Sequence, residues 1–392
     1  MIPILVVNRP GQLVSLRFIF NVGSTHERQD EHGIAHFVEH MAFTGTRAIS
    51  TAHVAKEMAR LGEFNAYTTY DRTVYYCTCL KENLFEAFEL MVSMLFLQND
   101  DRCPEIFQRE KSVIGEEISS RADDGYTVGW DKMYEVYGGT VFHPVTGTAA
   151  TVKAITEQQY KQFIQSNYHG GNLMIHVTGD VDTIEAVDDI NESLEDLVTG
   201  QTNVIHQPNR VIAQPPIDVV HQNQQSSYMR FYELPGEPNE SDRYVMLSAL
   251  LGGGMHSMLF ERIRNQLGLV YWVGAGQTQV GHQNGLFIGA KLAKDNITQL
   301  RTEIDQVLVG AVKNACGDLF DTTKKNVTFG FHQANDSLQG MEANNDAWWS
   351  VKQKAFDPQE YLAIVQGTSL SDMQGQLKEM LSHPCQELIV SN

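Results

Sequence analysis

The chain has 392 residues, of which 42% are hydrophobic and 20% are charged, a composition typical of a globular protein with two or three domains. Its 29 Lys and Arg against 48 Asp and Glu give a formal net charge of −19. This balance argues against nucleic acid or an anionic membrane as the main partner, because both bind basic surfaces.

Strands and helices are mixed through the first part of the chain. Residues 14–22 alternate apolar and polar side chains, which predicts a half-buried strand. Helices are expected over 33–43 and 51–61, and Gly62 ends the second. Residues 64–80 are rich in Tyr, Thr, Val and Cys and predict a strand or a tight pair of strands.

The pattern continues with two long helical stretches, at about 82–98 and 104–122, and with a strand over 172–180 followed by a helix. Between Gly200 and Pro216 the composition changes to Gln, Asn, Thr and Pro with little periodicity, which is typical of a linker.

Beyond this segment we expect a strand at 226–233, helices at 241–251 and 256–267, strands between 270 and 292, and then helices. Both halves therefore show strands mixed with helices in a similar order. This order predicts two α+β domains of comparable size. We place them at 1–203 and 217–392, with a linker at 204–216.

The five cysteines are scattered, and only Cys77 and Cys79 are close together. They are interpreted as buried, reduced thiols in a reducing compartment. The N-terminus has no signal-peptide pattern and no apolar run is long enough to span a bilayer, so the expected location is the cytoplasm, without a membrane partner.

The segment His36-Phe37-Val38-Glu39-His40 is the centre of the functional prediction. On a helix, His36 and His40 are one turn apart and project together, so both imidazoles can reach one ion. The order H-x-x-E-H is the inverse of the commoner H-E-x-x-H motif. A catalytic zinc site takes about three protein ligands and leaves a position for water, whose proton Glu39 could accept. The alternative is that these are solvated side chains on a polar helix face.

A third ligand has to come from elsewhere, and the stretch from Gln108 to Ile118 offers three acids. Glu110 and Glu117 are seven residues apart and share a helix face with Val113 and Ile114, whereas Glu116 is rotated by about 100°. An acid on the apolar side of a helix favours a compensating partner such as a metal. This argument favours Glu117 only modestly, and the choice between Glu116 and Glu117 stays open at this point.

These motifs resemble those of the pitrilysin and mitochondrial processing peptidase family of zinc metallopeptidases, and the resemblance covers nearly the whole chain. In that family H-x-x-E-H is followed by E-x-x-V-x-x-x-E, whose last Glu is the third ligand. Residues 110–117 match this pattern. The resemblance implies that Glu117 is a ligand and that Glu110 contacts a ligand histidine.

The segment 62–68 is similar to the family's G-x-x-N-A-x-T, which in relatives is an edge strand on which substrate lies. The resemblance implies that an extended peptide pairs with Asn65, Ala66 and Tyr67 through main-chain hydrogen bonds. Further landmarks are 143–148 and 168–173, the second with Gly in place of the family's Pro.

In the second half, residues 254–271 are close to the family's C-terminal signature. The resemblance implies that Arg264 and Tyr271 reach into the active site, where they hold substrate carbonyls or the oxyanion of the tetrahedral intermediate. The residues alone favour a surface charge for Arg264 and a core aromatic for Tyr271.

The resemblance implies two similar α+β domains, each a mainly antiparallel sheet flanked by helices, that together make half of a clamshell. The predicted activity is that of a zinc-dependent endopeptidase that cleaves peptides or unfolded segments, with one Zn²⁺ per chain. We expect a homodimer, or alternatively a heterodimer with a related subunit. Manganese or cobalt could replace zinc at such ligands.

Two rival functions are a non-catalytic partner or scaffold subunit and a metal-binding or storage protein. Scaffold members of the family usually lose a ligand or the catalytic Glu, and none is lost here. A storage protein would leave Glu39 without a purpose.

Overall fold

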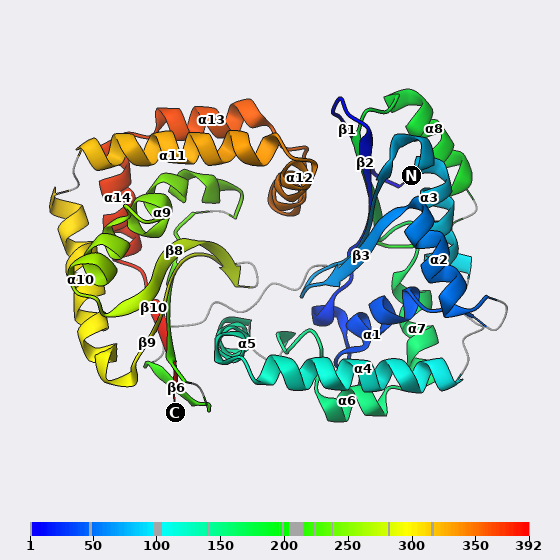
Figure 1. Cartoon of the computed structure of the whole chain (residues 1–392), viewed down its shortest axis with the longest axis horizontal. Coiled ribbons are helices and arrows are strands. Elements are labelled where there is room, and N and C mark those ends of the chain that lie inside the picture. The colour runs from blue at the N-terminus through cyan, green and yellow to red at the C-terminus, as the bar shows by residue number, and fades with distance from the viewer. Residues whose placement is uncertain are drawn as a thin grey trace. The chain divides into compact units, whose positions relative to one another are not determined.

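The computed structural model divides into two compact units (Figure 1). Unit 1 comprises Met1–Ser120 and Thr140–His206, and unit 2 comprises Arg121–Gly139 and Gln207–Asn392. The structure describes residues 2–46, 49–97, 104–138, 141–195, 197, 200–203, 215–222, 224–236, 238–280, 283–314 and 317–391. The linker predicted at 204–216 lies outside the described residues as far as 214. Within the described ranges, no helix is long and apolar enough to cross a membrane.

Unit 1 is built on a five-stranded sheet with the strand order β1-β5-β2-β4-β3. β1 and β5 pair in parallel, and the other neighbours are antiparallel. The strands are β1 (Ile4–Asn8), β2 (Leu13–Phe20), β3 (Gly62–Thr68), β4 (Thr73–Leu80) and β5 (Leu173–Gly179). The helices are α1 (Ile34–Ala42), α2 (Thr51–Leu61), α3 (Leu84–Val92), α4 (Pro104–Ala122), α6 (Ala149–Ala154), α7 (Glu157–Asn167) and α8 (Thr183–Ser193).

β2 is the central strand of this sheet, and its side chains point alternately to the two faces. Leu16, Phe18 and Phe20 are fully buried and belong to one core with apolar side chains of α1, α3, α4 and α7. The expectation of a half-buried strand is wrong, because Arg17 on the opposite face is also buried. Its guanidinium donates to the Tyr67 hydroxyl at 3.1 Å and lies over the ring of Tyr76.

Unit 2 repeats this topology in a second five-stranded sheet, with the order β6-β10-β7-β9-β8 and one parallel pair, β6 with β10. The strands are β6 (Ile217–Val220), β7 (Ser226–Glu233), β8 (Val270–Val280), β9 (Gln283–Leu292) and β10 (Cys385–Ser391). The helices are α5 (Gly125–Gly138), α9 (Val245–Gly252), α10 (Ile297–Asn314), α11 (Gly317–Asn335), α12 (Leu338–Lys352), α13 (Pro358–Gly367) and α14 (Leu370–Met380). The predicted fold class, two similar α+β domains with mainly antiparallel sheets, is confirmed.

In the sequence, helix α5 lies between the two segments that make up unit 1, but it packs on the sheet of unit 2. Its side chains Met133 and Tyr137 form a small core with Met229 and Phe231 of β7. Tyr228 and Tyr232, on the other face of β7, pack in the core that α9, α10 and α14 cover, so α5 lies on the opposite face of that sheet (Figure 1). The domain boundary predicted at 203 does not anticipate that residues 121–139, from the first half of the chain, belong to unit 2.

A buried ion cluster connects β7, β10 and α10 in unit 2. Glu387 of β10 accepts hydrogen bonds from Arg230 at 3.0 Å, from the Tyr228 hydroxyl at 2.5 Å and from the Arg301 Nε at 2.6 Å. Burial alone would raise the pKa of Glu387, but the three donors outweigh it and hold this pKa below its ordinary value.

Replacing Glu387 with Gln is expected to lower the free energy of unfolding by about 3 kcal/mol near neutral pH, because the buried Arg230 would keep only the largely exposed Asp305, at 2.5 Å, as a carboxylate partner among the ion pairs of this cluster. The depressed pKa stabilises the fold above the unfolded value of about 4.3, and this contribution is lost as the pH falls through the folded value. Urea unfolding across that window should therefore show a steeper acid loss for the wild type than for the variant. Equal slopes would contradict this account of the cluster.

Candidate metal centre

Helix α1 carries the H-x-x-E-H segment and is anchored by its apolar side. Ile34, Phe37 and Met41 have no exposed surface and belong to the core of unit 1. This anchoring leaves His36 and His40 on a common side of the helix, where their rings meet edge to face with centroids 4.6 Å apart. The predicted helix over 33–43 is therefore present and holds the imidazoles one turn apart, as the spacing requires.

Helix α4 brings a carboxylate to this pair. Oε2 of Glu117 lies 3.5 Å from Nε2 of His36 and 3.5 Å from Nε2 of His40. One donor atom from each of the three residues lies within 4.8 Å of the others, and this is the only such group of His, Cys, Asp and Glu in the described part of the chain. Donors on a tetrahedral zinc ion, with bonds of about 2.0–2.1 Å, stand about 3.4 Å apart. The donor set and its spacing therefore fit a zinc ion.

The structure separates the three acids of α4. Glu117 faces the histidines, whereas Glu116 is exposed to solvent. Glu110 is buried, with Oε2 at 3.7 Å from Nδ1 of His40 and Oε1 accepting from Arg109 at 2.9 Å. Glu110 thus lies behind a histidine, where a carboxylate can orient the imidazole. The sequence places Val113 on the apolar face of this helix, but its side chain is 46% exposed and therefore does not belong to the buried face.

Glu39 is buried beside the group and points toward strand β3. The hydroxyl of Thr68, the last residue of β3, donates to Oε2 of Glu39 at 2.6 Å. Burial raises the pKa of Glu39, while the Thr68 hydrogen bond and the charge of His40 oppose this effect. Burial disfavours the charged form of His40, but the hydrogen bond to Glu117 and the surrounding carboxylates raise its pKa overall. Thr68 was not among the predicted site residues, although it is the last position of the G-x-x-N-A-x-T segment.

The segment of Asn65, Ala66 and Tyr67 lies in β3, at an edge of the sheet of unit 1. Among the described strands β3 pairs only with β4, in antiparallel register from Gly62 opposite Cys79 to Thr68 opposite Thr73. Asn65 is exposed, and its side-chain oxygen accepts from the following amide at 2.8 Å. In the part of the chain that the structure describes, one main-chain edge of β3 thus has no neighbouring strand in its sheet.

Arg264 and Tyr271 lie together in unit 2, and the structure describes them within that unit alone. The guanidinium of Arg264 lies 4.7 Å from the ring centre of Phe260 and 5.3 Å from that of Tyr271. Tyr271 is the second residue of β8 and is 79% exposed, so its interpretation as a core aromatic is wrong. The Tyr271 side chain is thus largely exposed while the Arg264 guanidinium lies over its ring.

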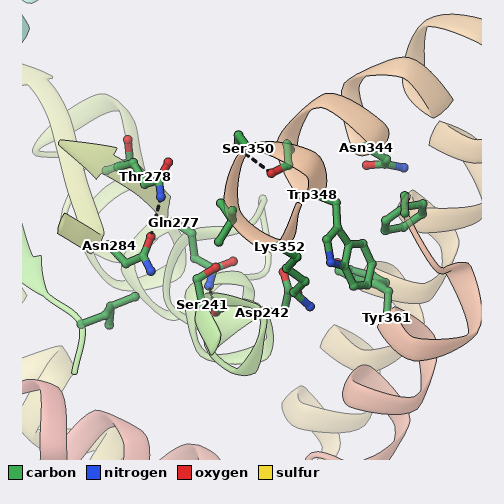
Figure 2. A pocket seen from close by; sticks show the side chains of 16 residues that line it. Ser241, Asp242, Gln277, Thr278, Asn284, Asn344, Trp348, Ser350, Lys352 and Tyr361 are labelled. Carbon is green, nitrogen blue, oxygen red and sulfur yellow. Dashed lines mark hydrogen bonds and ion pairs between the residues drawn. The ribbon is translucent and has the colours of Figure 1, made fainter. Parts of the chain in front are cut away.

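Unit 2 also contains a cavity of about 330 Å³ between β8 and α12 (Figure 2). Trp348 forms one wall, and the ammonium of Lys352 lies 3.8 Å from the centre of its ring. Lys352 is paired with Asp242 at 2.7 Å and Glu360 at 3.1 Å. No residue predicted from the sequence as part of the site lines this cavity.

Comparison with known proteins places these features in a family. Residues 4–123 match the family model described as insulinase (peptidase family M16), and residues 154–327 match the model described as peptidase M16 inactive domain. A zinc protease of Rickettsia felis is 31% identical over 75% of this chain and 73% of its own length. A zinc protease of Rickettsia bellii is 27% identical over 94% of this chain and 90% of its own length.

A solved structure of a protease from Helicobacter pylori has the same fold. It superposes with a TM-score of 0.86 over 99% of this chain and 97% of its own, at 20% sequence identity. The family resemblance that the H-x-x-E-H and E-x-x-V-x-x-x-E motifs indicate is therefore confirmed. This chain belongs to peptidase family M16.

Proposed function

We propose that this protein is a zinc-dependent endopeptidase that hydrolyses peptides or unfolded segments. The observation that carries the proposal is the meeting of His36, His40 and Glu117 around one point, with Glu39 buried beside them. The zinc proteases among its relatives support zinc as the metal. In this proposal the three grouped residues are the ligands, and Glu110 orients His40.

When bound at this group, zinc would act as a Lewis acid that polarises the scissile carbonyl and lowers the pKa of water. Glu39 takes a proton from the attacking water and later delivers it to the leaving amine nitrogen. The Thr68 hydroxyl holds the carboxylate in a single orientation for these transfers.

The open edge of β3 suggests how a peptide substrate is held. An extended chain can add to Asn65, Ala66 and Tyr67 through main-chain hydrogen bonds, which recognise any sequence. We assign Arg264 and Tyr271 to the substrate carbonyls or the oxyanion. Replacing Arg264 with Ala is then expected to lower kcat/KM by about 100-fold without loss of zinc. Unchanged kinetics in steady-state assays of that variant would remove Arg264 from the site.

We further propose that the chain works as a homodimer, with a heterodimer containing a related subunit as the alternative. A mass measurement by light scattering distinguishes a dimer from a single chain. The rival function is a non-catalytic subunit, which would bind zinc and its partner but turn over nothing.

The test is incubation of the purified protein with an unstructured peptide and, separately, with a stably folded protein, followed by mass spectrometry of the products. We expect cleavage at internal peptide bonds of the peptide and an intact folded protein. Zinc-loaded protein that leaves a broad set of unstructured peptides intact would favour the non-catalytic subunit.

A further inference from the structure

A buried acid outside the metal group contacts the beginning of α1. Glu27 has a side chain with 0% exposure, and its two oxygens accept hydrogen bonds from two amides of the helix start. Oε2 accepts from the N–H of Gly33 at 2.7 Å, and Oε1 accepts from the N–H of Ala35 at 2.8 Å. The second of these amides belongs to the residue directly before the ligand His36.

Helix α1 depends on this carboxylate because it has no cap of its own. Its N-cap is Gly33, with φ of 94° and no side chain that could accept a hydrogen bond. The first N–H groups of a helix have no partner within it and need an acceptor from outside. Glu27, six residues upstream of the N-cap, supplies that acceptor on both of its oxygens.

The loop at 143–147 packs against Glu27 and against the residues that lead into α1. Nε2 of His143 lies 3.5 Å from Oε2 of Glu27, and its ring stacks on His32 with centroids 3.6 Å apart. Gly147 packs so closely that a Cβ there would lie 2.4 Å from the carbonyl oxygen of His32, and a Cβ on Gly33 would lie 2.7 Å from that of Thr146. The segment 32–33 that leads into α1 therefore has close main-chain contacts with Thr146 and Gly147, and Glu27 binds amides at the start of the helix.

Burying a carboxylate is costly, and that cost must be offset by what it contacts. Burial raises the pKa of Glu27 well above its usual range, although the two amides oppose this effect. The positive end of the helix dipole lies at the same place and favours an acceptor there. Both oxygens of this buried acid are engaged by amides at the start of α1, which indicates a structural role rather than proton transfer.

We propose that Glu27 is a positioning residue that fixes the first turn of α1 and so holds His36 in its metal-binding position before the metal arrives. The inference rests on the proposed function of the same site. Because Ala35 directly precedes His36 in the same helix turn, movement of the Ala35 amide shifts the backbone that carries the His36 imidazole. If this turn is already fixed in the metal-free protein, metal binding has to order less of the chain and loses less conformational entropy.

The test is the Glu27→Gln variant in the full chain. A Gln side chain of the same shape offers one acceptor oxygen, and its NH₂ group would face the second helix amide. We expect zinc affinity, measured by competition with a chromophoric chelator, to fall by about tenfold or more. In the metal-free protein, hydrogen exchange of the amides at 33–37 should become faster, whereas exchange in β2 and β5 should not change.

Two control variants separate this role from general destabilisation. In Glu31→Gln, a neighbouring buried acid that pairs with Arg28 at 2.7 Å is changed, and zinc affinity should stay within about twofold of the wild type. Val177→Ala creates a cavity in β5, whose paired strands are β1 and β2, and should lower stability without lowering zinc affinity.

Wild-type zinc affinity and unchanged exchange at 33–37 in Glu27→Gln would overturn the proposal. If Glu27→Gln does not fold, Glu27→Asp decides the matter. Its shorter side chain keeps the carboxyl group but cannot reach both amides, so weaker zinc binding supports the proposal and wild-type binding overturns it. Failure of the wild type to bind zinc would contradict the proposed function instead, and the exchange comparison would still decide the role of Glu27.

Discussion

Replacing Glu39 with Gln is expected to lower kcat for peptide hydrolysis by about 10²–10⁴-fold while the protein keeps its zinc. The amide has nearly the shape of the carboxylate and can still accept the hydrogen bond from Thr68, but it cannot take a proton from water. The loss should therefore appear in kcat, with little change in KM.

Metal analysis of the same preparation is the control for this variant. A second control is Glu89→Gln, which changes an exposed acid of α3 and should leave turnover unchanged. If Glu39→Gln kept wild-type turnover, some other group would have to act as the base. If the variant lost zinc as well, the loss of activity would no longer report on proton transfer.

The two adjacent acids of α4 offer a sharp comparison of variants. Glu117→Gln removes a charged donor 3.5 Å from both imidazoles, and we expect zinc affinity to fall by at least about 100-fold, beyond the loss typical of an outer partner. Glu116→Gln removes the same charge one residue away, where the side chain faces solvent, and should leave zinc affinity unchanged.

Zinc affinity measured for both variants decides between these acids. The two variants change the same charge at adjacent positions. An effect on zinc affinity that both share would therefore come from the lost charge, and a difference between them would come from the position of the side chain. Equal losses would contradict the assignment of Glu117 as a ligand. A loss confined to Glu116→Gln would reverse the assignment.

The placement of His36 and His40 on one side of a helix could be predicted because their spacing is local. His36 and His40 lie on one helix turn, and the apolar residues between them determine which side of α1 is buried. The α+β pattern of each half could also be predicted, since the alternation in strands and the periodicity in helices are properties of short segments. The choice between Glu116 and Glu117 needed either the family motif or the structure, because it depends on how α4 is rotated toward α1.

Other features depend on contacts between distant segments and had no signal in the sequence. Helix α5 has aromatic side chains at helical spacing, but nothing local shows that they pack on the second sheet. Glu27 reads as a surface acid in a polar stretch, and its burial follows from where α1 begins. Tyr271 was interpreted as a core aromatic from its type alone, yet it lies exposed at the start of β8.

The most direct test of the metallopeptidase assignment is zinc titration of the metal-free wild-type protein, followed by the rate of cleavage of an internally quenched, unstructured peptide. The account predicts no cleavage after treatment with a chelator, and recovery that saturates at one zinc per chain. Cleavage that persists without metal, or a protein that takes up no zinc at the group of His36, His40 and Glu117, would contradict it.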